Sequence, residues 1–327
     1  MIRMSAPVRL DFAGGWTDVP PFATREGGEV VNAAIDLRVQ AEFEPGGNGL
    51  LLVAEDLKAS ARVTRAADLM SDGALQLHKA ALRMFPTGPG TLRTRSDVPP
   101  GSGLGSSGAL DVALVGTLTA VRGEELGLEE IAAHGCQLEI EEAGIPGGRQ
   151  DQYAAALGGF HRFRFRGDQV TVERLSLDSA FVSELERRTV VCYTGRSRVS
   201  GDTIARVMEA YERRDTMVCM ALSEMAAIAD RMAGALVAGD LAQVGRLLTA
   251  NWGCQQRLDL SMRTAEMAAL ESAMAEAGAL GGKAAGAGAG GSMFFLMRDG
   301  STGREAARRI GATVLEARWS ATGLTRC

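Results

Sequence analysis

The stretch that most constrains the fold is a glycine-rich loop followed by an apolar helix. Residues 99–108 run Pro-Pro-Gly-Ser-Gly-Leu-Gly-Ser-Ser-Gly, and the apolar segment from Ala109 to Val115 follows at once. Glycine lets the backbone bend around an anion, and the helix directs its free N–H groups and positive dipole end at the same point. The hydroxyls of Ser106 and Ser107 can cap the helix or bind a magnesium ion held by phosphates. The segment therefore predicts a phosphate-binding loop.

The same residues are compatible with a simpler role and match two nucleotide-binding motifs in part. A plain glycine turn with Ser106 as the helix N-cap needs no ligand and stays open. Gly103, Gly105 and Gly108 match G-x-G-x-x-G, but a dinucleotide-binding loop lies between two parallel apolar strands. Here residues 91–97 alternate polar and apolar, and residues 124–143 have helical spacing. The Lys-Ser/Thr pair of a P-loop is absent, so both of these nucleotide-binding motifs are excluded.

Bulk properties limit the class of protein. A chain of 327 residues predicts about two domains, and a net charge of −5 without a basic block argues against nucleic-acid or anionic-membrane partners. The five cysteines are scattered without C-x-x-C spacing, which predicts neither disulfides nor a zinc site and fits the cytoplasm. No run is long and apolar enough to span a membrane. We expect small-molecule partners, and a monomer or homodimer.

The loop resembles the central ATP-binding motif of the GHMP kinases, the family of galactokinase, homoserine kinase and mevalonate kinase. Three more segments, at residues 6–18, 147–160 and 283–291, resemble the other motifs of this family and occur in the same order along the chain. The resemblance therefore extends along nearly the whole chain. It implies an α+β fold with an N-terminal ribosomal-protein-S5-domain-2-like domain (1–188) and a C-terminal ferredoxin-like domain (189–327). The active site is expected between them, with ATP and Mg²⁺ as cofactors.

The resemblance also implies roles for single residues. Arg9 would lie by the transferred phosphoryl group, and Asp151 would accept the proton of the substrate hydroxyl. Taken alone, Arg9 could be a solvated strand residue and Asp151 an acid that suits a helix N-terminus. A kinase of this kind needs such a carboxylate and a nearby cation to keep it ionised.

The remaining site residues fall into three groups. Glu139 lies twelve residues before Asp151, the spacing of galactokinases, and with Ser107 it is the implied magnesium ligand, whereas Glu141 and Glu142 would be solvated. The phosphates of ATP are expected at Pro100, Gly101, Ser102, Gly103, Leu104, Gly105, Ser106 and Ser107. The sugar is expected at Gly15, Trp16, Thr17, Asp18, Gly147, Gly148, Arg149 and Gly288.

Two stretches bear on the substrate. Galactokinases carry Glu-His where this chain has Gly15 and Trp16, which argues against galactose, and Gly-Gly-Trp-Thr-Asp-Val-Pro-Pro resembles L-fucokinases. Residues 147–160 resemble the D-glycero-D-manno-heptose 7-phosphate 1-kinases. We therefore predict ATP-dependent phosphorylation of the anomeric hydroxyl of a heptose 7-phosphate or a related aldose, with L-fucose as the alternative. The distal phosphate would meet Arg149, or else Arg196 or Arg198.

Two further classes remain as alternatives. A non-catalytic sugar sensor would keep the loop but lose the acid, base or metal ligand, and an isoprenoid or amino-acid kinase would lack the sugar-binding Asp18. Outside the site, we expect His78 on a solvated helix face, a hairpin within residues 30–53 and a final strand over residues 312–319.

Overall fold

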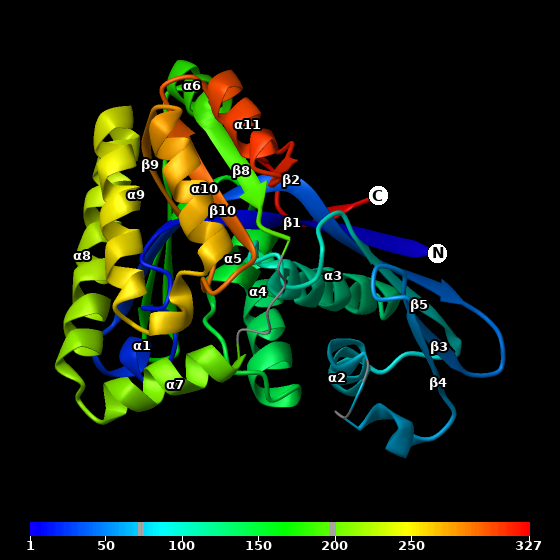
Figure 1. Cartoon of the computed structure of the whole chain (residues 1–327). Coiled ribbons are helices and arrows are strands. Elements are labelled where there is room, and N and C mark those ends of the chain that lie inside the picture. The colour runs from blue at the N-terminus through cyan, green and yellow to red at the C-terminus, as the bar shows by residue number, and fades with distance from the viewer. Residues whose placement is uncertain (71–72, 74, 196–200) are drawn as a thin grey trace.

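Two β-sheets organise the chain in the computed structural model, which describes residues 1–70, 73, 75–195 and 201–327 (Figure 1). In this part of the chain the first sheet has eight strands in the order β12-β1-β2-β5-β3-β4, and β6 and β7 extend it from β2. Its strands are β1 (Ile2–Ala13), β2 (Gly28–Pro45), β3 (Leu50–Ala54), β4 (Ala59–Val63), β5 (Gly90–Ser96), β6 (Phe160–Arg166), β7 (Gln169–Arg174) and β12 (Thr325–Arg326).

Helices cover the first sheet, and one of them begins at the glycine-rich loop. The central helix α3 (Ser106–Val121) is buried along most of its length. It carries apolar side chains on nearly all of its faces, as is typical of a buried helix. The other elements of this half are α1 (Phe22–Arg25), η1 (Ala66–Leu69), α2 (Gln76–Met84), α4 (Leu128–Gln137), the π-helical turn η2 (Leu138–Glu142) and α5 (Gln150–Leu157).

The predicted hairpin within residues 30–53 is wrong. Both strands exist, but β5 lies between them, antiparallel to β2 and parallel to β3. Alternation of apolar residues identifies a strand and its buried face, whereas the choice of neighbour depends on which segment covers the free edge. The expected hairpin of β6 and β7 is present.

The second sheet has the ferredoxin-like arrangement. Its strands are β8 (Thr189–Tyr193), β9 (Ala279–Ala284), β10 (Ser292–Met297) and β11 (Thr313–Leu315), all antiparallel in the order β11-β8-β10-β9. A helical segment joins β8 to β9 and another helix joins β10 to β11, which gives the β-α-β-β-α-β pattern. The helices are α6 (Ser179–Arg188), α7 (Gly201–Glu212), α8 (Thr216–Val237), α9 (Leu241–Gln256), η3 (Leu260–Met262), α10 (Ala265–Glu276) and α11 (Gly300–Arg309).

The segment after β11 returns to the first sheet. The expected final strand over residues 312–319 is only three residues long, because the chain then crosses over and Trp319 bridges to Ile35. Strand β12 pairs with β1, opposite Met4 and Ser5. Figure 1 accordingly shows the two marked chain ends side by side. The tail also holds the end of α5, because the N–H of Leu324 donates to the carbonyl of Ala156.

Candidate active site

A cavity of about 450 Å³ lies where β1, the glycine-rich loop, the start of α5 and the loop between β9 and β10 meet. The two halves of the chain are in direct contact there, since Ser292 N–H donates to the carbonyl of Ser102 over 2.7 Å. A Cβ on Gly286 would overlap the carbonyl oxygen of Gly103, so glycine allows this approach. Its lining residues include Arg9, Asp11, Trp16, Asp18, Val19, Gly105, Ser107, Glu139, Ile145, Gly148, Gln150, Asp151 and Ile204.

The loop presents a free helix N-terminus to this cavity. Helix α3 begins at Ser106, its N-cap is Gly105 at a φ of +77°, and no side chain caps it. The alternative in which Ser106 serves as a plain N-cap is therefore not observed. A Cβ on Gly105 would lie 3.1 Å from the carboxyl carbon of Asp151, so glycine also admits that side chain. The N–H groups of the first helical turn are available to an anion.

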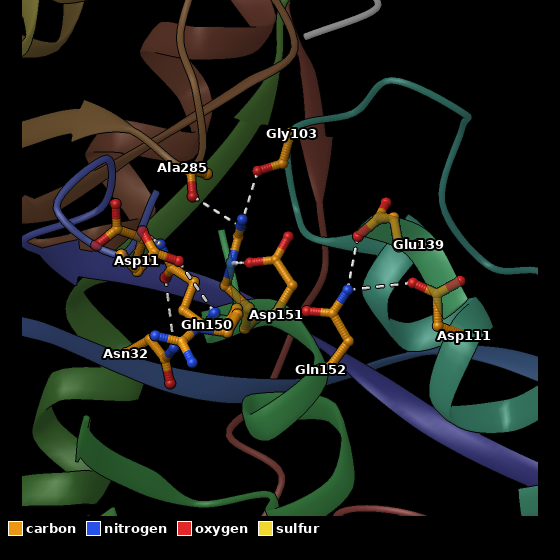
Figure 2. A network of polar contacts seen from close by, with 12 residues as sticks. Asp11, Asn32, Gly103, Asp111, Glu139, Gln150, Asp151, Gln152 and Ala285 are labelled. Atoms are coloured by element: carbon orange, nitrogen blue, oxygen red, sulfur yellow. Dashed lines mark hydrogen bonds and ion pairs between the residues drawn. The ribbon is translucent and has the colours of Figure 1, made fainter. Parts of the chain in front are cut away.

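Arg9 and Asp151 form an ion pair below the loop. The Arg9 Nε–H donates to Asp151 Oδ1 over 2.8 Å, and Nη1 donates to the carbonyls of Gly103 and Ala285, each over 2.9 Å (Figure 2). Arg9 is 5% exposed, so it is not the solvated strand residue of the alternative interpretation. Its three bonds hold β1, the loop, α5 and the end of β9 in one arrangement.

Glu139 lies on the other side of the cavity beside the loop. It is 7% exposed, accepts a hydrogen bond from Gln152 Nε2 over 2.6 Å and contacts the Ser107 hydroxyl. Burial raises the pKa of Glu139 to about 7, and the Ser107 hydrogen bond opposes the shift. Its neighbour Glu141 is exposed and Glu142 pairs with Arg83, which leaves Glu139 as the carboxylate of this trio that lines the cavity.

Asp18 is a further acidic side chain that lines the cavity, next to Gln150 at the start of α5. It is 1% exposed and accepts hydrogen bonds from Gln150 through the main-chain N–H, over 3.0 Å, and through Nε2, over 3.4 Å. Burial raises the pKa of Asp18 to about 6, against the main-chain hydrogen bond from Gln150. Such a carboxylate can accept hydrogen bonds from substrate hydroxyls.

A buried ion pair that the sequence does not predict lies beside this cavity. Lys283 of β9, fully buried, donates to Asp11 of β1 at both the carbonyl oxygen, over 2.6 Å, and Oδ2, over 2.9 Å. The pair joins β1 of the first sheet to β9 of the second. Asp11 lies two residues after Arg9 and therefore on the same face of β1, which is the one sequence signal that could have pointed to it.

Several predicted site residues lie elsewhere. Thr17 Oγ1 donates to the Gly14 carbonyl and stabilises the turn, and Ser102 and Leu104 are buried away from the cavity. Gly288 faces Gln255 and Met262, while its neighbours Gly286 and Ala287 line the cavity instead.

Arg149 also points away from the cavity. Its guanidinium donates to the carbonyls of Gly167 and Asp168 and lies 5.2 Å from the centre of the Phe165 ring. The prediction that Arg149 meets a substrate phosphate therefore has no support in this geometry. Arg196 and Arg198 lie outside the described residues.

A second cavity of about 180 Å³ adjoins the other side of the loop at Pro100, Gly101, Ser106 and Ser107. Most of its wall is apolar, formed by residues such as Val39, Leu57, Leu77 and Leu110. His78 lines it and shares a hydrogen bond of 2.7 Å with Thr94 Oγ1. The expectation of a solvated His78 is wrong, since the side chain is 2% exposed and burial lowers its pKa to about 4.

Two negative findings apply to the described residues. No helix among them is both long and apolar enough to cross a bilayer. No group of three or more His, Cys, Asp or Glu side chains among them could hold a metal ion.

Comparisons with known proteins agree with this geometry. Residues 62–159 match the family model "GHMP kinases N terminal domain", and residues 232–316 match "GHMP kinases C terminal". The chain is 32% identical to the D-glycero-alpha-D-manno-heptose 7-phosphate kinase of Campylobacter jejuni, over 90% of this chain and 89% of that one. It is 27% identical to the bifunctional fucokinase/GDP-fucose pyrophosphorylase of Arabidopsis thaliana, over 94% of this chain but only 31% of the relative.

A solved structure extends the likeness to the whole fold. The D-glycero-D-manno-heptose 1-phosphate kinase from Bacteroides thetaiotaomicron superposes with a TM-score of 0.77 at 26% identity, over 100% of this chain and 99% of that one. The expected fold class is thereby confirmed. The protein is an enzyme, a small-molecule kinase, and the chain belongs to the GHMP kinases, a family of ATP-dependent kinases.

Proposed function

We propose that this kinase transfers the γ-phosphoryl group of ATP to the anomeric hydroxyl of D-glycero-D-manno-heptose 7-phosphate or a closely related aldose. The observation that carries the proposal is the Asp151 carboxylate, which pairs with Arg9 over 2.8 Å and lines the same cavity as the free N-terminus of α3 and as Asp18. The likeness to the Campylobacter heptose 7-phosphate kinase supports this class of sugar.

The chemistry follows from these positions. Asp151 takes the proton of the sugar hydroxyl as the hydroxyl oxygen bonds to the γ-phosphorus and the bond from that phosphorus to the β–γ bridging oxygen breaks, leaving ADP. Arg9 orients the Asp151 carboxylate through their ion pair, while the N–H groups at the start of α3 hold phosphate oxygens. Asp18 holds a sugar hydroxyl. Catalysis then rests on positioning and charge stabilisation.

The site also fits a magnesium ion. Ser107 and Glu139 supply hard oxygen donors at the loop and are in hydrogen-bond contact with each other. Magnesium commonly takes one or two protein oxygens and completes its shell with phosphates and water, which agrees with the lack of a larger ligand cluster among the described residues. When bound, the ion would offset the negative charge of the phosphates.

The second cavity is where we place the nucleoside. It meets the loop at Pro100 and Ser107 on the side away from Arg9 and Asp151, and its apolar wall suits a flat base. The sugar and nucleoside would thus approach the loop from opposite sides.

A second substrate, L-fucose, is favoured by one feature of the main cavity. Trp16, Val19, Ile145 and Ile204 give it an apolar side, and Arg9 is the sole cation among its described lining residues. A neutral sugar with a C6 methyl group would suit such a wall.

The test is a substrate panel with Mg·ATP: the heptose with and without its 7-phosphate, and L-fucose. ADP release and the ³¹P–¹H coupling of the product identify the substrate and the phosphorylated position, with Asp151→Asn protein as the control for contaminating kinases. We expect a C1 phosphate and the highest kcat/KM for the heptose 7-phosphate. Equal turnover with and without the 7-phosphate would favour the neutral-sugar kinase, and a product phosphorylated elsewhere would refute the proposal.

A further inference from the structure

Behind Glu139 lies a buried polar cluster that the proposed chemistry does not use. The side-chain amide of Gln152 donates from Nε2 to Glu139 Oε2, over 2.6 Å, and to Asp111 Oδ2, over 3.1 Å. Figure 2 shows Gln152 between the two carboxyl groups, which come from η2 and α3. Asp111 and Gln152 have no solvent exposure. One amide group therefore joins three separate elements at the edge of the active site.

Two polar atoms of this cluster lack hydrogen-bond partners among the described residues, so the cluster is poorly suited to stabilise the fold. Gln152 Oε1 and Asp111 Oδ1 are buried and accept no hydrogen bond from any residue that the structure describes. A buried acid next to another acid is costly, and an apolar side chain of similar size would avoid that cost. Buried groups left unpaired in this way call for a role other than stability.

Local geometry directs the cluster at the loop. Asp111 follows Ser107 by four residues in α3, so the two side chains share a helix face. Glu139 lies in the π-helical turn η2, a conformation frequently found at functional sites. The Glu139 carboxyl group contacts the Ser107 hydroxyl at the loop. It also contacts the side chains of Gln152 and Asp111, which are buried.

Two glycines bring α5 close enough for these bonds. A Cβ on Gly108 of α3 would lie 2.5 Å from Asp151 Cβ and 3.0 Å from the Gln152 main-chain nitrogen. A Cβ on Gly135 of α4 would lie 3.1 Å from Gln152 Cγ. Gln152 directly follows Asp151 in the first turn of α5. This turn therefore positions both Asp151, the proposed proton acceptor, and Gln152, which donates a hydrogen bond to Glu139.

We propose that Gln152, with Asp111 behind it, is a positioning residue that orients the Glu139 carboxylate toward the metal–phosphate group at the loop. The inference rests on the metal role of Glu139 proposed above. Hydrogen-bond partners of metal ligands typically set ligand orientation and account for about 10- to 100-fold in metal affinity.

The test measures Mn²⁺ binding to the enzyme in complex with a non-hydrolysable ATP analogue, by the EPR signal of free Mn²⁺. Gln152→Met keeps the side-chain volume and removes both donated bonds, and we expect it to raise the Mn²⁺ Kd about 10-fold or more. Sugar affinity, measured by calorimetry, should stay within about twofold. Thr119→Val is the matched control, because Thr119 of α3 is also buried and loses its hydrogen bonds to the Val115 and Gly116 carbonyls far from the site.

The outcomes separate the inference from the proposed function. A folded Gln152→Met protein with wild-type Mn²⁺ affinity overturns the inference, provided that Glu139→Gln weakens binding. If Glu139→Gln leaves Mn²⁺ binding unchanged, the metal role of Glu139 fails, and the inference with it. Should Gln152→Met not fold, Gln152→Ala serves instead, since alanine also removes both donated bonds and should weaken Mn²⁺ binding as well.

Discussion

Gly148→Ala tests directly whether Asp18 binds the sugar. A Cβ at position 148 would lie less than 3.0 Å from both carboxylate oxygens and the carboxyl carbon of Asp18, closer than real Cβ contacts allow. The backbone at Gly148 needs no left-handed conformation, so alanine is tolerated and the Asp18 side chain has to move. The displaced carboxylate would lose its 3.0 Å hydrogen bond from the Gln150 main chain and its place against the sugar.

The magnitude follows from the bond that is lost. A hydrogen bond to a charged group contributes about 1.5–3 kcal/mol, and about 1.4 kcal/mol corresponds to a factor of ten. The sugar KM should therefore rise roughly 10- to 150-fold, while the KM for ATP stays within about twofold. A coupled assay of ADP release provides both constants, and calorimetry with the sugar alone provides its Kd.

The neighbouring glycine supplies the comparison. A Cβ on Gly147 would find only Glu139 Oε2, at 3.9 Å, so Gly147→Ala should change the sugar KM by less than about threefold. A folded Gly148→Ala enzyme with wild-type sugar KM would show that Asp18 does not hold the substrate. An equal rise in both KM values would show instead that the whole cavity is deformed.

Three more predictions concern the acids of the site. Asp151→Asn should lower kcat by about two orders of magnitude or more and leave the nucleotide Kd nearly unchanged in calorimetry, and near wild-type turnover would contradict its role as the base. Glu139→Gln should raise the Mg²⁺ concentration for half-maximal rate about tenfold or more, with the sugar KM nearly constant, and an unchanged Mg²⁺ titration would exclude Glu139 as a ligand. Because burial raises the pKa of Asp18 to about 6, kcat/KM for the sugar, measured at saturating Mg²⁺ so that the metal keeps the Glu139 carboxylate ionised, should fall as the pH drops below about 6, where the Asp18 carboxylate takes up a proton and loses acceptor capacity. Asp18→Asn should remove this acidic limb from the pH profile, and a limb that persists unchanged would assign it to another group.

Local sequence chemistry was sufficient for the parts of the site that lie within one segment. The glycine-rich loop and the start of α3 follow from backbone freedom and helix dipole alone. Glu139 and Asp151, which both line the cavity, were chosen because their spacing resembles that of galactokinases. Asp111 was within reach too, as the lone charged residue in the apolar run after the loop, four positions from Ser107.

Contacts between distant segments could not be predicted in the same way. Arg149 stands beside Gln150 and Asp151 in sequence, yet it turns toward the β6–β7 turn because carbonyls and the Phe165 ring lie there. His78 has a polar side chain and an ordinary helical setting, but Thr94 of β5 covers it. The place of β5 between β2 and β3 is likewise decided by packing that no local pattern contains.

The return of β12 to the first sheet has a consequence for how the protein is made. The bond from Thr325 Oγ1 to the Ser5 carbonyl joins residues 320 positions apart, so the short edge of β1 at Met4 and Ser5 lacks its strand partner until β12 has been translated. At about 5–20 residues per second, a ribosome needs roughly 16–64 s to cover that distance. For all that time the main-chain groups of Met4 and Ser5 form a short unpaired edge, which is a template for wrong pairing. This end of the first sheet can therefore be completed only after β12 has left the ribosome.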